Sequence, residues 1–205
     1  MPEALATWMW ENIVEISGAL LGLMYIFFSI RQHIFTWPTG LLTSLLYTVV
    51  FFRSGFYADM GLQVYYVVVS LYGWYYWLKG GRNNGNSDGQ APVRKTPRKF
   101  ILAGLIGTVV IYFVLVAVLL NFTDSTIPYM DSLTTALSIT ATWMLARKYI
   151  EHWLIWIFVD LFSAGLYVYK QLWPTAILFL VYTVMAVLGY IAWKKELKTQ
   201  FEKQK

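Results

Sequence analysis

The chain has 205 residues, of which 58% are hydrophobic, 19% aromatic and 13% charged, and its mean hydropathy is +0.53. Soluble domains average ~45–50% apolar and ~25% charged residues, so the composition excludes an ordinary soluble domain and predicts an all-α, multi-pass membrane protein. Cysteine is absent and histidine occurs at two positions, which argues against disulfides, metal centres and cofactors bound through them. The acidic N-terminal segment lacks the basic region and cleavage site of a signal peptide, so the first apolar stretch is expected to stay in the mature protein.

Seven apolar stretches are long enough to cross ~30 Å of hydrocarbon as helices. Their length and their lack of strict alternation favour seven transmembrane helices over a β-barrel. In chain order they run from Ile13 to Ile30, Ile34 to Phe52, Tyr57 to Leu78, Phe100 to Leu120, Met130 to Ala146, Trp153 to Tyr169 and Leu172 to Trp193.

The basic residues predict the orientation of these spans. Arg53 and Lys170 are the only two of the 16 Lys and Arg residues that fall on one side of the predicted membrane. Cytoplasmic loops carry the excess of Lys and Arg, so the N-terminus is predicted outside and the C-terminus inside. The net charge of +5 is then explained by the basic residues on the cytoplasmic side. The expected partner is the lipid bilayer, and binding to nucleic acid is not expected.

The two halves of the chain resemble each other. A shift of 116 residues, without a gap, superposes Arg31 on Arg147, Trp37 on Trp153, Tyr66 on Tyr182, Gly73 on Gly189 and Trp77 on Trp193. Equivalent spans lie four crossings apart, so the repeats are predicted to be parallel, in a 3+1+3 arrangement with a site between them near the midplane. The predicted parts are a first repeat over residues 1–79, a flexible basic cytoplasmic loop over 80–99, a linker helix over 100–121, a second repeat over 122–194 and a cytoplasmic tail over 195–205.

The strongest functional signal is a carboxylate inside the sixth span. Trp153, Trp156 and Asp160 follow an i, i+3, i+7 spacing, which places two indoles and the acid on one helical stripe. A charge at membrane depth costs about 2.5–3.5 kcal/mol and usually faces a bundle interior or a wet cavity. We interpret the stripe as a binding site; the alternatives are an interfacial belt role for Trp153 and a structural hydrogen bond or helix cap for Asp160.

Further candidate binding residues lie on other spans. Gln63 and Tyr66 share a face of the third span, and Gln63 lacks a polar counterpart in the other repeat, where Phe179 stands. Because neither Asp160 nor Gln63 has a polar counterpart of the same kind in the other repeat, a site between the repeats suits an asymmetric ligand. Gln63 can instead form a hydrogen bond between helices. The remaining candidates are Trp37, Ser44 and Tyr47 on the second span, Thr135 and Ser138 on a hydroxyl face of the fifth span, and Tyr182 on the seventh.

Catalytic signatures are missing from the sequence. It contains no HExxH, no GxSxG, no P-loop and no paired intramembrane carboxylates, so no catalytic residues and no enzymatic activity are expected. A membrane-embedded enzyme and a receptor or assembly protein stay open as alternatives to a transporter.

Taken together, these motifs resemble those of the PnuC family of bacterial nicotinamide riboside transporters. The resemblance covers all seven segments and rests on W-x-x-W-x-x-x-D at 153–160, on Gln63-x-x-Tyr66, on Tyr72-Gly73-Trp74 and on the run from Ala136 to Trp153. It implies a fold similar to the SWEET sugar transporters, a location in the bacterial inner membrane, homotrimers, and facilitated diffusion drawn inward when a cytoplasmic nicotinamide riboside kinase phosphorylates the substrate.

The candidate residues suit that substrate chemically. Nicotinamide riboside carries a pyridinium cation, which indole faces attract by ~0.5–2 kcal/mol. Asp160 offers acceptors to ribose hydroxyls or a charge to the pyridinium, and Gln63 can pair with the carboxamide. Because no arginine cluster lies in the core, the phosphorylated product is expected to bind poorly. Transport of another vitamin or of a sugar-like molecule on the same fold is the alternative.

Overall fold

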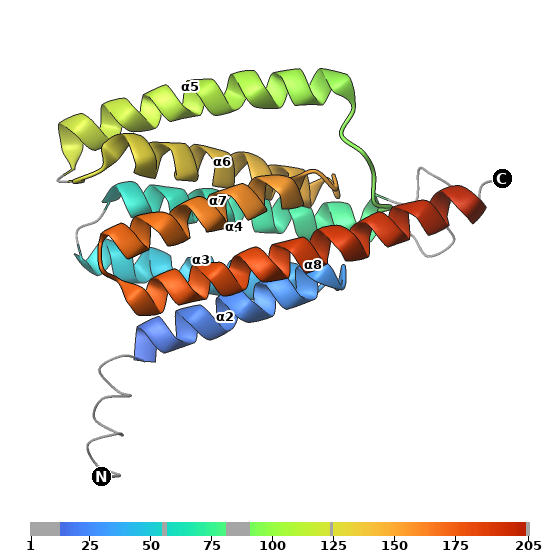
Figure 1. Ribbon diagram of the computed structural model, residues 1–205, viewed down its shortest axis with the longest axis horizontal. Coiled ribbons are helices and arrows are strands. Elements are labelled where there is room, and N and C mark those ends of the chain that lie inside the picture. The colour runs from blue at the N-terminus through green and yellow to red at the C-terminus, as the bar shows by residue number, and fades with distance from the viewer. Residues whose placement is uncertain (1–12, 55–56, 81–90, 124, 204–205) are drawn as a thin grey trace, which may run out of the picture. The chain divides into compact units, whose positions relative to one another are not determined.

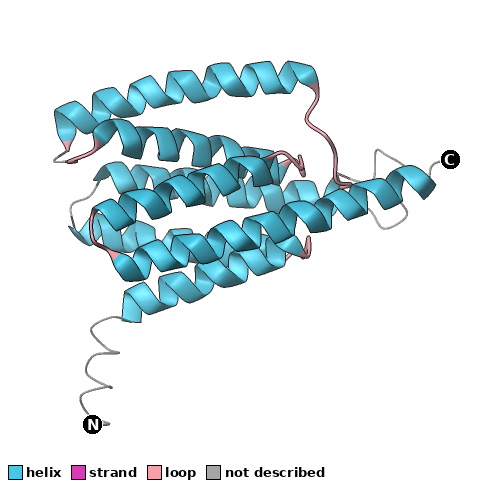
Figure 2. Ribbon diagram, in the orientation of Figure 1, coloured by secondary structure: helices cyan, strands magenta, loops and turns pink. Residues whose placement is uncertain are grey.

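The structure, a computed structural model, describes residues 13–54, 57–80, 91–123 and 125–203. All regular structure in this part of the chain is helical (Figures 1 and 2). The helices are α2 (Ile13–Ile30), α3 (Thr36–Ser54), α4 (Tyr57–Lys79), α5 (Arg98–Phe122), α6 (Pro128–Ala146), α7 (His152–Tyr169) and α8 (Trp173–Lys203).

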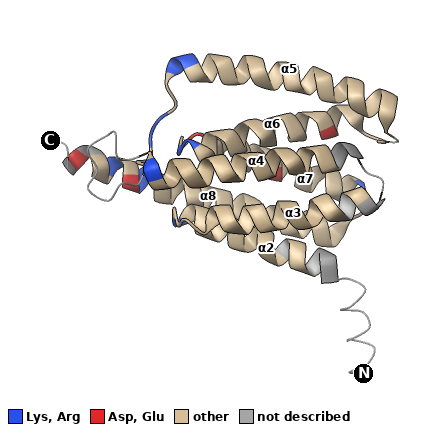
Figure 3. Ribbon diagram, turned by 180° about the vertical axis from the view of Figure 1, so that it is seen from behind, with Lys and Arg blue, Asp and Glu red and all other residues tan. Residues whose placement is uncertain are grey.

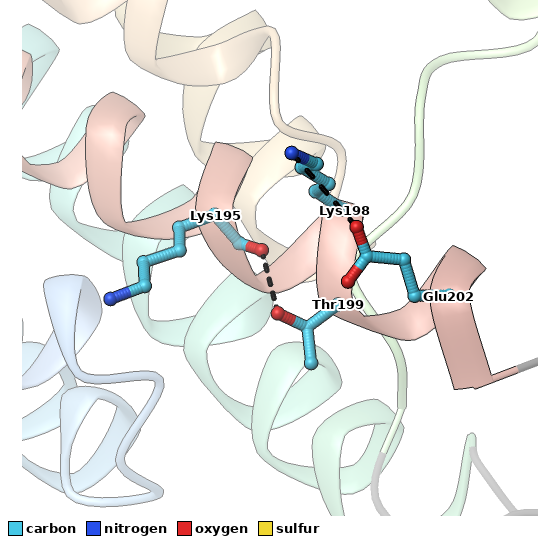
Figure 4. Close-up of polar contacts among 4 residues, drawn as sticks. All are labelled: Lys195, Lys198, Thr199 and Glu202. Atoms are coloured by element: carbon cyan, nitrogen blue, oxygen red, sulfur yellow. Dashed lines mark hydrogen bonds and ion pairs between the residues drawn. The ribbon is translucent and has the colours of Figure 1, made fainter.

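Each predicted apolar stretch coincides with one of these helices, to within about a turn at every end except the C-terminal end of α8, so the prediction of an all-α fold is confirmed. The last helix is longer than predicted, because α8 continues past Trp193 to Lys203 through the expected tail. Its final turns carry contacts within the helix: the Thr199 hydroxyl donates to the Lys195 carbonyl, and Lys198 pairs with Glu202 at 3.9 Å (Figure 4).

Three helices in the described part are long and apolar enough to cross a membrane: α5, α7 and residues Trp173–Gln200 of α8. Helix α5 differs from the others because none of its side chains is buried. Its apolar residues are therefore available to lipid or to another protein surface.

The chain divides into two compact units, Met1–Trp74 and Tyr75–Lys205, with the boundary inside α4. In the first unit α2 packs on α3. In the second unit α5 packs on α6, α6 on α7, and α7 most extensively on α8. A hydroxyl pair joins α5 to α6, since the Thr108 and Thr140 oxygens lie 2.6 Å apart.

The turn between α2 and α3 and the turn between α6 and α7 have the same backbone geometry. Gln32 and Lys148, which the 116-residue shift superposes, adopt the left-handed φ angles of 53° and 54°. In the first turn the His33 N–H donates to the Phe28 carbonyl at 2.9 Å, and in the second the Tyr149 N–H donates to Met144 at 3.0 Å. Such bonds close the carbonyl end of a helix and release the chain in a new direction.

A tryptophan and a glycine pack together in the same way in each unit. Trp37 is fully buried against Gly73 in the first unit, and Trp153 is buried against Gly189 in the second. At both glycines a Cβ atom would overlap the indole, so the absence of a side chain lets the two helices approach closely.

Residues 91–97, here called the strap, lead into α5 and form an ordered segment (Figure 1). Ala91 and Val93 are each 2% exposed, and Arg94 forms a parallel β-bridge with Tyr149 in the α6–α7 turn. Composition predicts a flexible loop over 80–99, and within this range the strap is hydrogen-bonded to the α6–α7 turn, since the Arg94 N–H donates to the Lys148 carbonyl and the Ile150 N–H donates to the Arg94 carbonyl. Residues 81–90 of the predicted loop lie outside the described residues.

Basic residues gather at the end of the second unit where the strap meets the α6–α7 turn, with more at the start of α5 and on the last part of α8 (Figure 3). Near the turn, the Lys148 ammonium lies 4.5 Å from the centre of the Trp77 ring, and Arg94 donates to the Tyr76 hydroxyl at 2.8 Å. The Trp77 indole N–H donates to the Leu145 carbonyl at 3.3 Å and so satisfies one of the open carbonyls at the end of α6.

Candidate functional site

Asp160 is buried near the middle of α7. It is 5% exposed, and no described residue gives it a hydrogen bond or an ion pair. Buried carboxylates are normally paired, because removing their charge from water without a partner costs several kcal/mol. An external hydrogen-bond donor or cation would therefore stabilise this side chain. The alternative that Asp160 makes a structural hydrogen bond finds no partner among the described residues.

The two stripe tryptophans occupy different surroundings. Trp153 is 3% exposed, with its ring against Gly189 and within 5.8 Å of the Trp193 ring centre. Trp156, one turn further along α7, is only partly buried. The geometry gives Trp153 a packing role between α7 and α8 and leaves part of the Trp156 ring accessible. Binding by either indole stays a prediction.

Trp153 belongs to an aromatic cluster that the sequence pattern did not reveal. The His152 ring lies 4.5 Å from Trp153 and 4.8 Å from Trp193, and Trp193 lies 6.2 Å from Trp77. His152 is fully buried, and its Nδ1 bonds the Tyr149 carbonyl at 2.7 Å. The corresponding residue of the first unit, Thr36, is also fully buried and uses its hydroxyl for the equivalent bond, which indicates a structural role for His152.

The other candidates in the second unit are partly buried. On α6, the Ser138 hydroxyl donates to the Thr134 carbonyl at 2.8 Å, which leaves its oxygen free to accept, and Thr135 lies nearby on the same helix. Tyr182 on α8 makes an edge contact with Phe179 at 5.6 Å. Ser132 also lies on this hydroxyl face, is fully buried, and has no hydrogen-bond partner among the described residues.

The remaining predicted residues belong to the first unit. On α3, Trp37 packs on Gly73, Ser44 is 5% exposed, and the Tyr47 hydroxyl lies against Gly18 of α2. On α4, Gln63 and Tyr66 are partly buried, one turn apart on one face. Each unit, taken by itself, therefore has predicted polar and aromatic side chains on two or more helices.

The first unit fills one stripe position differently. Gly40, which the 116-residue shift superposes on Trp156, lies against the ring of Tyr25, where an added Cβ would come within 2.9 Å of a ring carbon. At the position of Tyr25 the second unit has Ala141, which is fully buried. The first unit thus combines Tyr25 with Gly40, and the second combines Ala141 with Trp156. At this position of the stripe, therefore, only the second unit has an indole.

The described residues contain no group of three or more His, Cys, Asp or Glu side chains able to hold a metal ion. The candidate site consists instead of a lone carboxylate, hydroxyls and aromatic rings. Such a set can bind a cationic aromatic ring and hydroxyl groups.

Comparisons with known proteins agree with the resemblance drawn from the motifs. The crystal structure of the vitamin B3 transporter PnuC matches with a TM-score of 0.72 over 96% of this chain and 87% of that one, at 22% identity, which shows a common fold. The nicotinamide riboside transporter PnuC of Escherichia coli (strain K12) is 24% identical over 204 residues, covering 88% of this chain and 84% of the relative.

A relative with another substrate in its name is about equally similar. The riboflavin/roseoflavin transporter RibM of Streptomyces davaonensis is 27% identical over 188 residues, covering 90% of this chain and 84% of the relative. The family described as nicotinamide mononucleotide transporter matches residues 12–195. The chain belongs to this transporter family.

Proposed function

We propose that this protein carries nicotinamide riboside across the bacterial inner membrane. Family membership and the PnuC relatives support a transporter of this class. The observation that carries the substrate assignment is Asp160, a buried carboxylate with no partner among the described residues, on a helix that also presents Trp156. A pyridinium riboside supplies both the positive charge and the hydroxyl donors that this side chain lacks.

In the proposed complex the pyridinium ring stacks on Trp156, and Asp160 accepts from ribose hydroxyls or faces the ring charge. Gln63 and Tyr66, with Ser44, Tyr47 and Trp37, contribute from the first repeat. Thr135, Ser138, Tyr182 and Trp153 complete the proposed set from the second. Gln63 is assigned to the carboxamide because its side chain both donates and accepts.

The proposed architecture has seven membrane-spanning helices in a 3+1+3 parallel repeat, with the N-terminus outside and the C-terminus inside. The matching turns at Gln32 and Lys148 and the matching Trp–Gly packing support the repeat. The basic cluster around the strap and α8 supports an inward-facing C-terminus.

The proposed mechanism is uniport by alternating access, with a cytoplasmic nicotinamide riboside kinase trapping the substrate as its phosphate. A homotrimer is proposed from the resemblance and is supported by α5, which has no fully buried side chain and whose exposed apolar surface suits lipid or a neighbouring protomer. The absence of an arginine cluster on the candidate stripe supports poor binding of the phosphorylated product.

A riboflavin transporter is the second candidate, because RibM is about as similar to this chain as the PnuC relatives are. The two substrates differ in charge, since nicotinamide riboside is a cation and the isoalloxazine ring of riboflavin is neutral. Asp160 therefore discriminates between them: its charge favours the cation by Coulomb attraction and gives the neutral ring no such gain.

The test is uptake of labelled nicotinamide riboside, riboflavin and nicotinamide mononucleotide into proteoliposomes, with and without an enclosed riboside kinase and ATP. We expect equilibration of nicotinamide riboside without the kinase and accumulation with it. Asp160→Asn and Trp156→Ala should each lower uptake about tenfold or more. Asp131→Asn, whose carboxylate already accepts from Ser125 at 2.7 Å, and the exposed Trp173→Ala are matched controls that should retain uptake.

Faster uptake of riboflavin than of nicotinamide riboside, unchanged by Asp160→Asn, would replace the first proposal with the second. Wild-type uptake in both stripe variants would remove the stripe from the site.

A further inference from the structure

Glu151 joins the strap to helix α7. Its carboxylate oxygen Oε2 accepts hydrogen bonds from the Thr96 backbone N–H at 2.9 Å and from the Thr96 hydroxyl at 2.7 Å. Its backbone carbonyl accepts from the Leu154 N–H at 3.0 Å, in the first turn of α7. One residue therefore holds the strap with its side chain and starts α7 with its main chain.

The carboxylate of Glu151 is not used to cap its own helix. Glu151 occupies the N-cap position of α7 but makes no side-chain capping bond there. Hydrogen bonds to an ionised acceptor are shorter and about twice as strong as neutral ones, and two of them converge on one oxygen at the strap. The Glu151 side chain thus binds a residue 55 positions away in the chain and does not cap the N-terminus of α7.

A second anchor lies next to this contact. The Arg94 N–H donates to the Lys148 carbonyl at 3.0 Å, and the Arg94 carbonyl accepts from the Ile150 N–H at 3.0 Å. Val93 and Thr96 on either side are 2% and 8% exposed. The strap is therefore held by backbone bonds, by a carboxylate and by burial.

The turn itself does not require this contact. The α2–α3 turn has a residue in the left-handed conformation at the corresponding position and the same backbone hydrogen bonds. The residue that corresponds to Glu151 there is Phe35, which is 54% exposed and has no side-chain hydrogen-bond acceptor. Because the same turn forms without a carboxylate, the Glu151–Thr96 contact has a role other than specifying the turn.

We propose that the strap and Glu151 form a brace that stays docked throughout transport and positions α7. Glu151 is then a positioning residue for Trp156 and Asp160, and this inference rests on the proposed function. Asp160 follows Glu151 by about two and a half turns, or ~13 Å of helix axis, so a shift at the start of the helix is carried to the stripe. A binding group misplaced by about 1 Å can lose two orders of magnitude in activity.

The first test is the KM for nicotinamide riboside in proteoliposomes. Glu151→Ala should raise the KM about tenfold while Glu151→Gln, which keeps an acceptor oxygen, restores most of the affinity. Thr96→Val loses the hydroxyl bond but keeps the backbone bond, so its KM should lie between wild type and Glu151→Ala, and Thr96→Ser should match wild type. Glu202→Ala on the exposed end of α8 is the matched carboxylate control. A wild-type KM and maximal rate in Glu151→Ala overturn the brace.

A disulfide tests whether the brace stays docked. Paired residues on adjacent strands lie ~4.8 Å apart, within the 4.4–6.8 Å that a disulfide needs between Cα atoms, so Arg94→Cys with Tyr149→Cys can cross-link the bridge in this cysteine-free chain. Oxidised and reduced forms of this variant should transport at equal rates. When Glu151→Ala is added, oxidation should restore the KM and reduction should raise it again. Loss of uptake on oxidation would show that the strap must undock and would overturn the proposal.

Hydrogen exchange separates failure of the brace from failure of the transport assignment, because it needs no substrate. In Glu151→Ala the backbone amides of Arg94, Thr96 and Ile150 should exchange faster than in wild type. Unchanged exchange, with wild-type uptake of nicotinamide riboside intact, overturns the brace alone. Absence of uptake of every vitamin by the wild-type protein, with faster exchange in the variant, overturns the transport assignment and leaves the docking of the strap supported.

Discussion

Gly189 makes room for the indole of Trp153. A Cβ atom at this position would lie 2.6 Å from a carbon of the buried ring, closer than atoms in proteins approach. Gly189→Ala should therefore destabilise the protein by ~1–3 kcal/mol through overpacking, measured as a lower melting temperature in detergent. Gly165→Ala in α7 is the control, because its Cβ meets nothing within 4 Å, and alanine there should be neutral or stabilising by ~0.5–1 kcal/mol. Equal melting temperatures for the two variants would contradict the packing role of Trp153.

Lys148 is a buried cation in the α6–α7 turn, outside the helices. It is 2% exposed, and burial lowers its pKa to about 8, while the charge of Glu196 opposes part of this shift. Since the folded-state pKa lies below the unfolded value, the unfolded chain binds the proton more tightly. The charged lysine thus costs stability below pH 8, and this cost fades as the pH rises from about 8 toward 10.5.

Lys148→Met should accordingly be more stable than wild type by ~1–3 kcal/mol at pH 7, and the difference should shrink above pH 8. Melting temperatures of both proteins across this pH range measure the effect, and groups shared by both cancel in the comparison. Lys195→Met, at an exposed position on α8, should not change the melting temperature. A constant difference between Lys148→Met and wild type at all pH values would contradict the buried charge.

At the scale of elements, α8 extends beyond the apolar stretch that predicts it, and Leu197 is the last of its described side chains that is buried. This residue is 8% exposed and lies one turn after the fully buried Trp193, on the same face. A chain that ends at Lys198 should keep its melting temperature and its uptake, because the described contacts that it loses are exposed ones within the helix. A chain that ends at Lys195 should have a free energy of unfolding lower by ~1–3 kcal/mol, because it loses the Leu197 side chain, and should therefore melt at a lower temperature. Equal melting of both truncated chains would show that Leu197 contributes no packing.

The helices could be predicted from the sequence and the strap could not. Apolar stretches of about 20 residues fix their own structure, because a backbone in lipid satisfies its hydrogen bonds only within a helix. The strap has no periodic pattern, and its order comes from Glu151 and Tyr149, more than 50 residues further along the chain. Local composition gives no information on such partners. For the same reason the spacing that placed Trp153 and Trp156 on one stripe did not reveal that Gly189 covers the first of them.

At the scale of the whole molecule, the internal similarity of the sequence has counterparts within each unit. Gln32 and Lys148 share a rare backbone conformation, and Trp37 and Trp153 share glycine partners. The residues proposed for binding differ between the halves, since Asp160 and Trp156 of the second half correspond to Ser44 and Gly40 of the first. Within each unit the turn and the Trp–Gly packing are kept, while the polar side chains at corresponding positions differ.

The distribution of charge over the whole chain predicts the orientation of the protein in the membrane. The α7–α8 turn carries Lys170, and the opposite end of the second unit carries the basic residues of the strap and of α8. Translocation of clustered Lys and Arg is disfavoured, so the Lys170 side should face outward and the end of α8 inward. In the cysteine-free chain, Lys170→Cys should react with a membrane-impermeant maleimide in intact cells, whereas Lys195→Cys should react only after the membrane is opened. The chain without either substitution is the control for labelling. The reverse pattern would invert the proposed topology, and with it the assignment of the strap and Glu151 to the cytoplasmic side where a riboside kinase would act.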